Sequence, residues 1–245
     1  MGDVLVGCSG WSYPHWRDPV YQRRPSGEWL ERYAEMFPTT EVNNTFYRLP
    51  SERMVRGWAE RSPDGFVFAI KVSRYLTHVR RLREAGEGLG LLLERIAPLT
   101  EAGKVGPFLW QLPPTFKRDD DRLAAALAEL PTGRHCFEFR HESWFCEPVE
   151  RLLAGAGAAL VFADHPERTY QTFAPTADWV YVRLHYGHRG RRGNYSESEL
   201  EEWAKRISGW ARGRDVFVYF DNDWEAFAVA NALRMRALLG LAVPV

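Results

Sequence analysis

The sequence has 245 residues, with few cysteines, few lysines, no excess of either charge and no long apolar run. The three cysteines, Cys8, Cys136 and Cys146, form no CxxC pair, which favours a reducing compartment over an oxidising one. No segment approaches the roughly 18 consecutive apolar residues of a membrane helix. The first residues lack the basic segment that begins a signal peptide. We therefore expect a cytoplasmic protein with no membrane partner.

The charges balance, because 32 Lys+Arg face 32 Asp+Glu. This balance excludes a uniformly basic protein that coats nucleic acid through its bulk charge. Lysine occurs only at positions 71, 104, 117 and 205, so 32 − 4 leaves 28 arginines. Any preference for an anionic ligand must therefore arise from local groups of residues.

Several nucleotide and metal motifs are also absent. The sequence contains no P-loop, no GxGxxG fingerprint and no HExxH pair, so no motif identifies a nucleotide cofactor, and the cofactor stays open. Hydrophobic residues make up 45% of the chain, and aromatic residues 14%, which is typical of a globular protein with one well-buried core. No linker or low-complexity segment divides residues 1–245, so we expect a single domain.

Short β-prone runs alternate with segments of helical periodicity along the whole chain. The runs cover residues 3–8, 39–43, 66–71, 107–112, 134–140, 158–164, 179–185 and 215–221. The clearest helical segments are Ser51–Arg61, Gly88–Leu99, Asp121–Leu130, Ser196–Trp210 and Trp224–Leu239. Eight strand–helix repeats in a chain of this length predict an α/β protein with a single (β/α)8 TIM barrel. A doubly wound open sheet is the alternative, because periodicity does not establish closure.

Polar residues stand at the C-terminal ends of these otherwise apolar runs, where barrels of this class hold their active sites. Residues two apart in a strand share a face, so Glu138 pairs with Arg140 and Arg183 with His185. The residues between such pairs, Val42, Phe139 and Leu184, should point towards the helices. The polar residues are Ser9, Glu41, Asn43, Lys71, Gln111, Glu138, Arg140, Asp164, Arg183, His185, Asp221 and Asn222.

Two segments predicted to follow strands contain several arginines and no acidic residue, namely 71–83 and 183–195. We expect a positively charged barrel mouth from Arg80, Arg81, Arg189, Arg191 and Arg192. The glycine-rich segment His188–Gly193 follows the seventh strand, where barrels often bind phosphate. The first predicted loop is aromatic, and its Trp11 and Tyr13 are expected to line a ligand pocket.

A divalent metal site is a separate possibility. The acidic residues and histidine at the strand ends suit a hard cation, and the nearby cations compete with a metal by pairing with the same carboxylates. We therefore assign no metal ligand. The candidate donors are Glu41, Glu138, Asp164, His185 and Asp221, and the competing cations are Lys71, Arg140 and Arg183.

Ordered motifs across the chain resemble those of the YecE-like family, number seventy-two in the series of domains of unknown function. The first blocks are Gly7-x-Ser9-Gly10-Trp11-x-Tyr13-x-x-Trp16 and Glu41-x-Asn43-x-Thr45-Phe46-Tyr47-x-x-Pro50. Later blocks are Phe68-x-x-Lys71, Thr77-His78, Gln111-Leu112-Pro113-Pro114-x-Phe116, Glu138-x-Arg140-x-x-Ser143-Trp144, Arg183-x-His185, Phe220-x-Asn222 and Ala230-Asn231-Ala232. The resemblance implies a TIM barrel and no established reaction. The sequence departs from the family pattern at Tyr186, inserted before Gly187, and at Asp221, where asparagine is common.

We predict an enzyme that performs acid–base chemistry on an anionic small molecule, phosphorylated or carboxylated. The predicted catalytic residues are Glu41, Glu138 and His185, with Glu138 kept ionised by Arg140 and either Glu41 or His185 as the proton donor. A glycoside hydrolase using Glu41 and Glu138, and a barrel that binds nucleic acid, are the alternatives. The oligomeric state stays open. The predicted substrate-binding residues are Ser9, Trp11, Tyr13, Asn43, Lys71, His78, Gln111, Arg140, Asp164, Arg183, Tyr195, Asp221 and Asn222.

Overall fold

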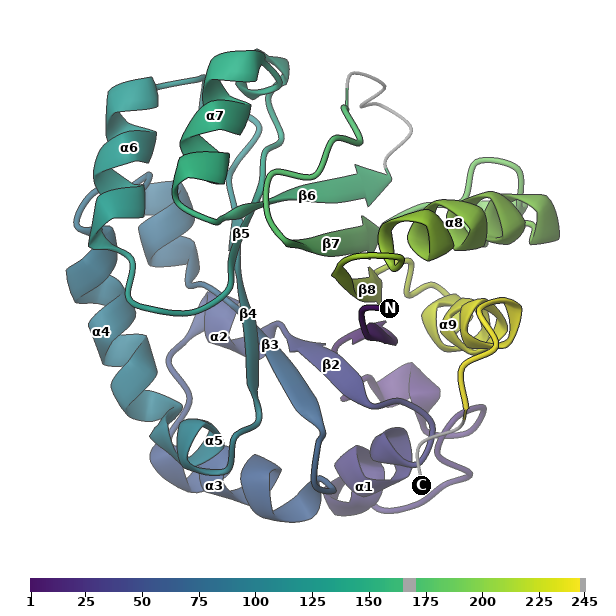
Figure 1. The fold of residues 1–245 in the computed structure, drawn as a ribbon. Helices are drawn as coiled ribbons and strands as arrows, with labels where there is room; N and C mark the ends of the chain where they lie inside the picture. Colours follow the sequence, from purple (N-terminus) through teal and green to yellow (C-terminus); the bar gives the residue numbers. More distant parts are fainter. Residues whose placement is uncertain (165–170, 243–245) are drawn as a thin grey trace.

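The computed structural model describes residues 1–164 and 171–242. Within these residues, eight parallel strands follow one another around a closed barrel, in which β8 returns to pair with β1 (Figure 1). This closure confirms the predicted (β/α)8 barrel and excludes the open sheet. The strands are β1 Val4–Ser9, β2 Thr39–Val42, β3 Val67–Lys71, β4 Val105–Gln111, β5 His135–Glu138, β6 Ala159–Asp164, β7 Trp179–Leu184 and β8 Asp215–Phe220.

Helices surround the barrel and connect its strands (Figure 1). A single π-helical turn, Tyr75–Val79, follows β3 at the mouth. None of the helices in the described residues is long and apolar enough to cross a membrane. The α-helices are α1 Trp29–Ala34, α2 Asn44–Tyr47, α3 Glu52–Arg61, α4 Ala85–Arg95, α5 Ala97–Glu101, α6 Asp120–Glu129, α7 Glu147–Gly155, α8 Glu197–Trp210 and α9 Phe227–Leu238.

Two predicted helices differ from the structure by more than one residue at an end. The predicted helix Gly88–Leu99 is divided into α4 and α5 at Ile96, because Pro98 has no N–H to continue the helical hydrogen bonds. The predicted helix Trp224–Leu239 begins only at Phe227. The two residues before it, Glu225 and Ala226, have left-handed φ values of 53° and 60°, which a helix cannot include.

Alternation along the strands separates two apolar cores. In β7, Trp179 and Tyr181 belong to the small core inside the barrel, whereas Val182 belongs to the large core between the strands and the helices. The inner core ends below the C-terminal strand ends, where Arg183 takes the next inward position. Polar side chains therefore form the top layer of the barrel interior. The predicted outward residues Val42, Phe139 and Leu184 all join the outer core.

Helix α8 begins with a capping box that also holds the loop after β7. The Ser196 hydroxyl and the Glu199 Oε2 atom cap the first turn reciprocally. The other carboxylate oxygen, Glu199 Oε1, accepts hydrogen bonds from the backbone N–H groups of His188 (2.6 Å) and Arg189 (3.0 Å). One buried carboxylate thus joins the helix start to a mouth loop.

Strands β1 and β2 approach each other closely at Gly7. A Cβ atom at this position would lie 2.1 Å from the carbonyl oxygen of Thr39. Beside this contact, the Tyr33 hydroxyl accepts from the Cys8 N–H at 2.7 Å and donates to the Thr39 carbonyl at 3.0 Å. A buried tyrosine thus bridges the two strands just below the polar layer.

We predict that Gly7→Ala lowers the free energy of unfolding by about 1–3 kcal/mol, because the added methyl group forces the strands apart. Urea denaturation measures the change. Gly90→Ala is the matched control, since a Cβ at Gly90 meets no atom within 4 Å. The control should gain up to about 1 kcal/mol from its helical position. Equal stability of the two variants would contradict the close approach.

Candidate active site

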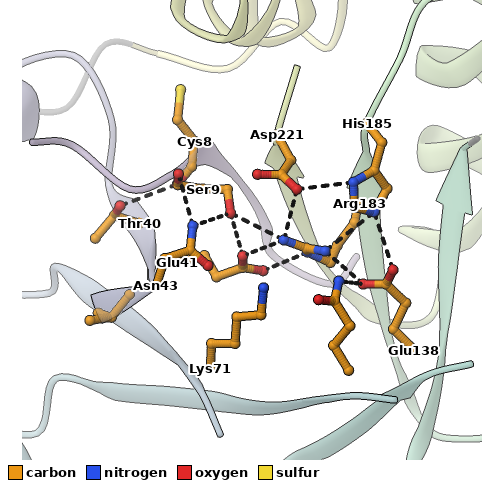
Figure 2. A network of polar contacts seen from close by, with 12 residues as sticks. Cys8, Ser9, Thr40, Glu41, Asn43, Lys71, Glu138, Arg183, His185 and Asp221 are labelled. Carbon is orange, nitrogen blue, oxygen red and sulfur yellow. Dashed lines mark hydrogen bonds and ion pairs between the residues drawn. The ribbon is translucent and has the colours of Figure 1, made fainter. Parts of the chain in front are cut away.

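The Arg183 guanidinium lies at the centre of the polar layer and is fully buried (Figure 2). It holds Glu41 through two hydrogen bonds, Nε to Oε2 at 2.9 Å and an Nη2 contact to Oε1 at 2.7 Å. It also binds Glu138 Oε2 at 2.6 Å and Asp221 Oδ2 at 3.1 Å. Three carboxylates from β2, β5 and the end of β8 therefore meet at one cation from β7.

Glu41 is as fully buried as Arg183, and its other contacts fill both carboxylate oxygens. The Ser9 hydroxyl donates to Oε1, and the Tyr181 hydroxyl donates to Oε2 at 2.7 Å. Asn43 in turn donates to the Ser9 hydroxyl at 2.8 Å. Its distance in sequence from an arginine made Glu41 a predicted proton donor, but the barrel places it directly against Arg183. Glu41 therefore forms a buried ion pair with Arg183.

Glu138 has contacts on both oxygens as well. Gln111 donates to Oε2 at 2.8 Å, Arg140 Nε lies 3.1 Å from Oε1, and His185 Nε2 lies 3.3 Å from Oε1. Burial raises the pKa of Glu138, but the charges of Arg183, Arg140 and His185 outweigh it and hold the pKa well below its usual range. This direction favours the ionised carboxylate at neutral pH, with Arg183 contributing more than Arg140.

His185 and Asp221 form a close pair beside this network. His185 Nδ1 lies 2.9 Å from Asp221 Oδ2. Burial lowers the pKa of His185, but Glu138 and Asp221 raise it to a net value above normal. Burial likewise raises the pKa of Asp221, yet Arg183 and His185 bring it well below its usual range. The pair lines a cavity of about 410 Å³ between the ends of β7 and β8.

A second histidine–carboxylate pair, not predicted from the sequence, involves a residue that lines the same cavity. His15 Nε2 lies 3.0 Å from Asp223 Oδ2, and Trp16 Nε1 donates to Asp223 Oδ1 at 2.6 Å. Burial raises the pKa of Asp223 to about 6, against the opposing effects of Trp16 and His15. Asp221 and Asp223 therefore have pKa values pushed in opposite directions, a pattern typical of acid–base sites. Asp223 lies two residues after Asp221, so the alternation of side chains after β8 could have identified it as a site residue.

Cations gather on the side of the mouth formed by β3 and β5. Burial, together with the charges of four nearby cations, lowers the pKa of His78 to about 4. His78 lies edge-on to Phe46, 5.2 Å between ring centroids, while Lys71 Nζ lies 4.5 Å from the same ring. This side of the mouth has a positive field. The four cations are Arg74, Arg140, Lys71 and Arg81.

The arginine rim differs from its prediction, because acids from neighbouring segments reach four of the five side chains. Segments free of acid in the sequence are therefore not free of acid in space. These exposed ion pairs compensate part of the positive charge of the rim. Arg80 pairs with Glu84, Arg189 with Glu202 at 2.9 Å, Arg191 with Glu225 at 3.4 Å, and Arg192 with Glu225 at 3.6 Å.

The two aromatic residues of the first loop have different positions. Trp11 packs edge-on against Trp58 and Phe68, with centroid distances of 5.5 and 6.1 Å, so it belongs to the apolar packing. Tyr13 donates its hydroxyl proton to the Ser9 carbonyl and supports the network from above β1.

Three predicted substrate-binding residues support the mouth loops instead of contacting Arg183. Asp164 accepts from His188 Nε2 at 2.8 Å and from Trp203 Nε1 at 3.2 Å. The Tyr195 hydroxyl accepts from the backbone N–H of Tyr186. Asn222 lines the cavity but donates to the Gly193 carbonyl (3.0 Å) and to Asn231 (2.9 Å).

The candidate metal donors do not gather as a cation site. Arg183 stands among Glu41, Glu138 and Asp221, and Asp164 lies with the loop after β7. Across residues 1–164 and 171–242, no group of three His, Cys, Asp or Glu side chains is placed to hold a metal ion. Glu41, Glu138 and Asp221 instead form ion pairs with the Arg183 guanidinium.

We predict that Arg183→Met lowers the free energy of unfolding by about 3–5 kcal/mol at pH 7, because it leaves buried carboxylates unpaired. The loss should shrink towards pH 4. In the parent protein, Glu138 and Asp221 have lowered pKa values, so their contribution is present above about pH 4 and is lost as pH falls. In the variant, protonation relieves the unpaired charges.

Chemical denaturation at several pH values measures this difference. Arg151→Ala is the control, because Arg151 pairs with Glu147 on an exposed helix surface. The control should cost no more than about 1 kcal/mol at any pH. A pH-independent loss for Arg183→Met would mean that packing, and not charge, accounts for the effect.

A third prediction concerns Asp223. Carboxyl carbon NMR should show this group titrating near pH 6. His15→Phe should raise the pKa further, because the phenyl ring keeps the cover over Asp223 and removes the charge and the hydrogen bond. His188→Phe, which alters the pairing of Asp164, should leave the titration unchanged. A midpoint near pH 4 in the parent protein would contradict the assignment.

Comparison with known proteins agrees with the motifs and the fold. A family model described as "Protein of unknown function DUF72" matches residues 5–244. The UPF0759 protein YunF of Bacillus subtilis (strain 168) is 24% identical over 274 residues, covering 97% of this chain and 95% of that protein. A crystal structure of a DUF72 family protein from Thermotoga maritima is 27% identical, with a TM-score of 0.87, covering 97% of this chain and 99% of that chain.

An AP endonuclease, family 2, from Brucella melitensis has a TM-score of 0.55 over 97% of this chain and 98% of that chain. Its 10% identity shows a likeness of fold alone. The family match, in contrast, spans nearly the whole sequence and agrees with the resemblance of its motifs. The chain therefore belongs to the DUF72 family of proteins of unknown function.

Proposed function

We propose that this protein is an enzyme that performs acid–base chemistry on a small anionic molecule, carrying a phosphate or a carboxylate group. One observation carries the proposal: a histidine with a raised pKa and a carboxyl group with a pKa of about 6 face one cavity at the barrel mouth. A carboxyl group with a pKa of about 6 can both accept and release protons near neutral pH. His185 and Asp223 are the proposed proton-transfer residues.

The cations beside His78 favour a substrate that carries a negative charge. Lys71 and Arg140 line the β3–β5 side of the mouth, and exposed Arg74 and half-buried Arg81 add to the field there. A substrate that spans the mouth would place its anionic group against these cations and its reacting carbon towards His185. Arg183 is held by carboxylates, so we assign it to positioning Glu138, Asp221 and His185.

A glycoside hydrolase is less well supported by this geometry. Such an enzyme requires one carboxylic acid that is protonated and one that is ionised. Arg183 binds both Glu41 and Glu138 directly, and the pKa of Glu138 is held low. We further propose a cytoplasmic location, supported by free thiols at Cys8, Cys136 and Cys146.

Proton NMR in D2O tests the proposal, because loss of a substrate proton signal is visible even when the product is unidentified. The protein should exchange a carbon-bound proton for deuterium in some phosphorylated or carboxylated compounds, and in none of their neutral analogues. Binding of those compounds should weaken as salt rises. The double change Arg74→Gln and Arg81→Gln should weaken binding at least about tenfold, or 1.4 kcal/mol.

Arg189→Gln is the matched control, since Arg189 pairs with Glu202 and should have little influence on binding. His185→Gln should abolish exchange and keep anion binding, because it removes the proton-transfer group and retains the cations. Equal exchange of neutral and anionic compounds would contradict the proposed substrate class. Full exchange in His185→Gln would contradict the role of the histidine.

A further inference from the structure

Lys71 is the one residue of the polar layer whose charged group has no hydrogen-bond or ion-pair partner among the described residues. The side chain is 8% exposed and extends from the end of β3, with Nζ against the face of Phe46. In Figure 2 the amine points towards Glu41 and Arg183, and no dashed line reaches it. Buried amines normally find acceptors, so this arrangement requires an explanation.

The other buried lysine in the described chain shows the usual arrangement. Lys104 Nζ donates to the carbonyls of Ala59 and Ser62, each at 2.7 Å, and to the Ser62 hydroxyl at 3.1 Å. Its three protons are satisfied, and it is fixed as an ammonium group. Within residues 1–164 and 171–242 the amine of Lys71 lies against an aromatic face and has no hydrogen-bond acceptor, which leaves its protons and lone pair available to a ligand.

The surroundings of Lys71 also favour the uncharged amine. Burial lowers the pKa of Lys71, and the positive charge of Arg183 lowers it further, against the opposing effects of Glu41, Asp221 and Glu138. A buried amine beside another cation is the usual setting of a nucleophilic lysine. A guanidinium could not lose its proton at this site, whereas an amine can.

We propose that Lys71 Nζ forms a covalent imine with an anionic aldehyde or ketone, so that the substrate of the proposed acid–base reaction is a carbonyl compound carrying phosphate or carboxylate. This inference rests on the proposed function and names its substrate class. The positive field beside His78 would hold the anionic group while the carbonyl carbon meets the amine.

Imine formation needs only the Lys71 amine, the carbonyl compound and a proton donor of the site. The nitrogen lone pair of the neutral amine forms the C–N bond, and one amine proton passes to the carbonyl oxygen. The resulting hydroxyl group leaves as water with a second proton, supplied by an acid of the site, and a protonated imine remains. The positive charge on that nitrogen then draws electrons towards the imine carbon. A proton on the carbon next to the imine carbon therefore becomes easier for a base to remove.

Reductive trapping with pyridoxal 5′-phosphate tests the proposal, because this probe carries both an aldehyde and a phosphate. Sodium borohydride reduces the imine to a stable secondary amine, and peptide mass spectrometry locates it. At low probe concentration Lys71 should be labelled ahead of the exposed Lys117 and Lys205. Inorganic phosphate and added salt should both reduce the labelling.

Lys71→Arg should abolish the preferred label and keep phosphate binding, since Arg74, Arg81 and Arg140 remain in place. Lys117→Arg is the control and should leave labelling of Lys71 unchanged. The labelling of the unaltered protein is informative even if Lys71→Arg folds poorly. Labelling of Lys117 and Lys205 ahead of Lys71, with phosphate binding intact, overturns the imine alone. Absence of any salt-dependent phosphate binding overturns the proposed function as well.

Discussion

The barrel interior depends on one buried cation. Arg183 neutralises carboxylates that the strand order brings together at the top of the barrel interior, and the fully buried Glu41 and Glu138 would otherwise be costly to bury. The ion pairs leave little freedom to the residues around them. Glu138 holds His185 from one side and Asp221 holds it from the other, so the guanidinium indirectly determines where the imidazole lies.

The mouth therefore has two parts with different physical roles. The side formed by β7 and β8 contains Asp223, whose pKa is raised to about 6 chiefly by burial, and His185, whose pKa is raised by its carboxylate neighbours. The side formed by β3 and β5 contains Lys71, Arg74, Arg81 and Arg140, whose charges add to the effect of burial in lowering the pKa of His78. Strain accompanies the mouth loops, since Arg81, Leu82 and Arg192 have left-handed backbone angles.

Much of this could be predicted from the sequence, because strand spacing and polar strand ends are local patterns. Spacing established the eight repeats, and alternation placed Glu41, Glu138 and Arg183 on the inner face. Contacts across the barrel have no such local signal: Tyr181 resembles a core residue, yet it donates to Glu41. The ion pair between Arg191 and Glu225 joins segments that no periodicity relates. Charge counted along one segment therefore overestimated the field of the rim.

The two oxygens of Glu199 have a consequence for how the mouth can move. One oxygen completes the cap of α8 and the other holds the backbone of His188 and Arg189, so the loop and the helix end share a single anchor. Lifting this loop away from the barrel would also fray the first turn of α8. The resulting cost favours a loop that keeps one position, and any gate for an entering molecule would have to open elsewhere along the rim.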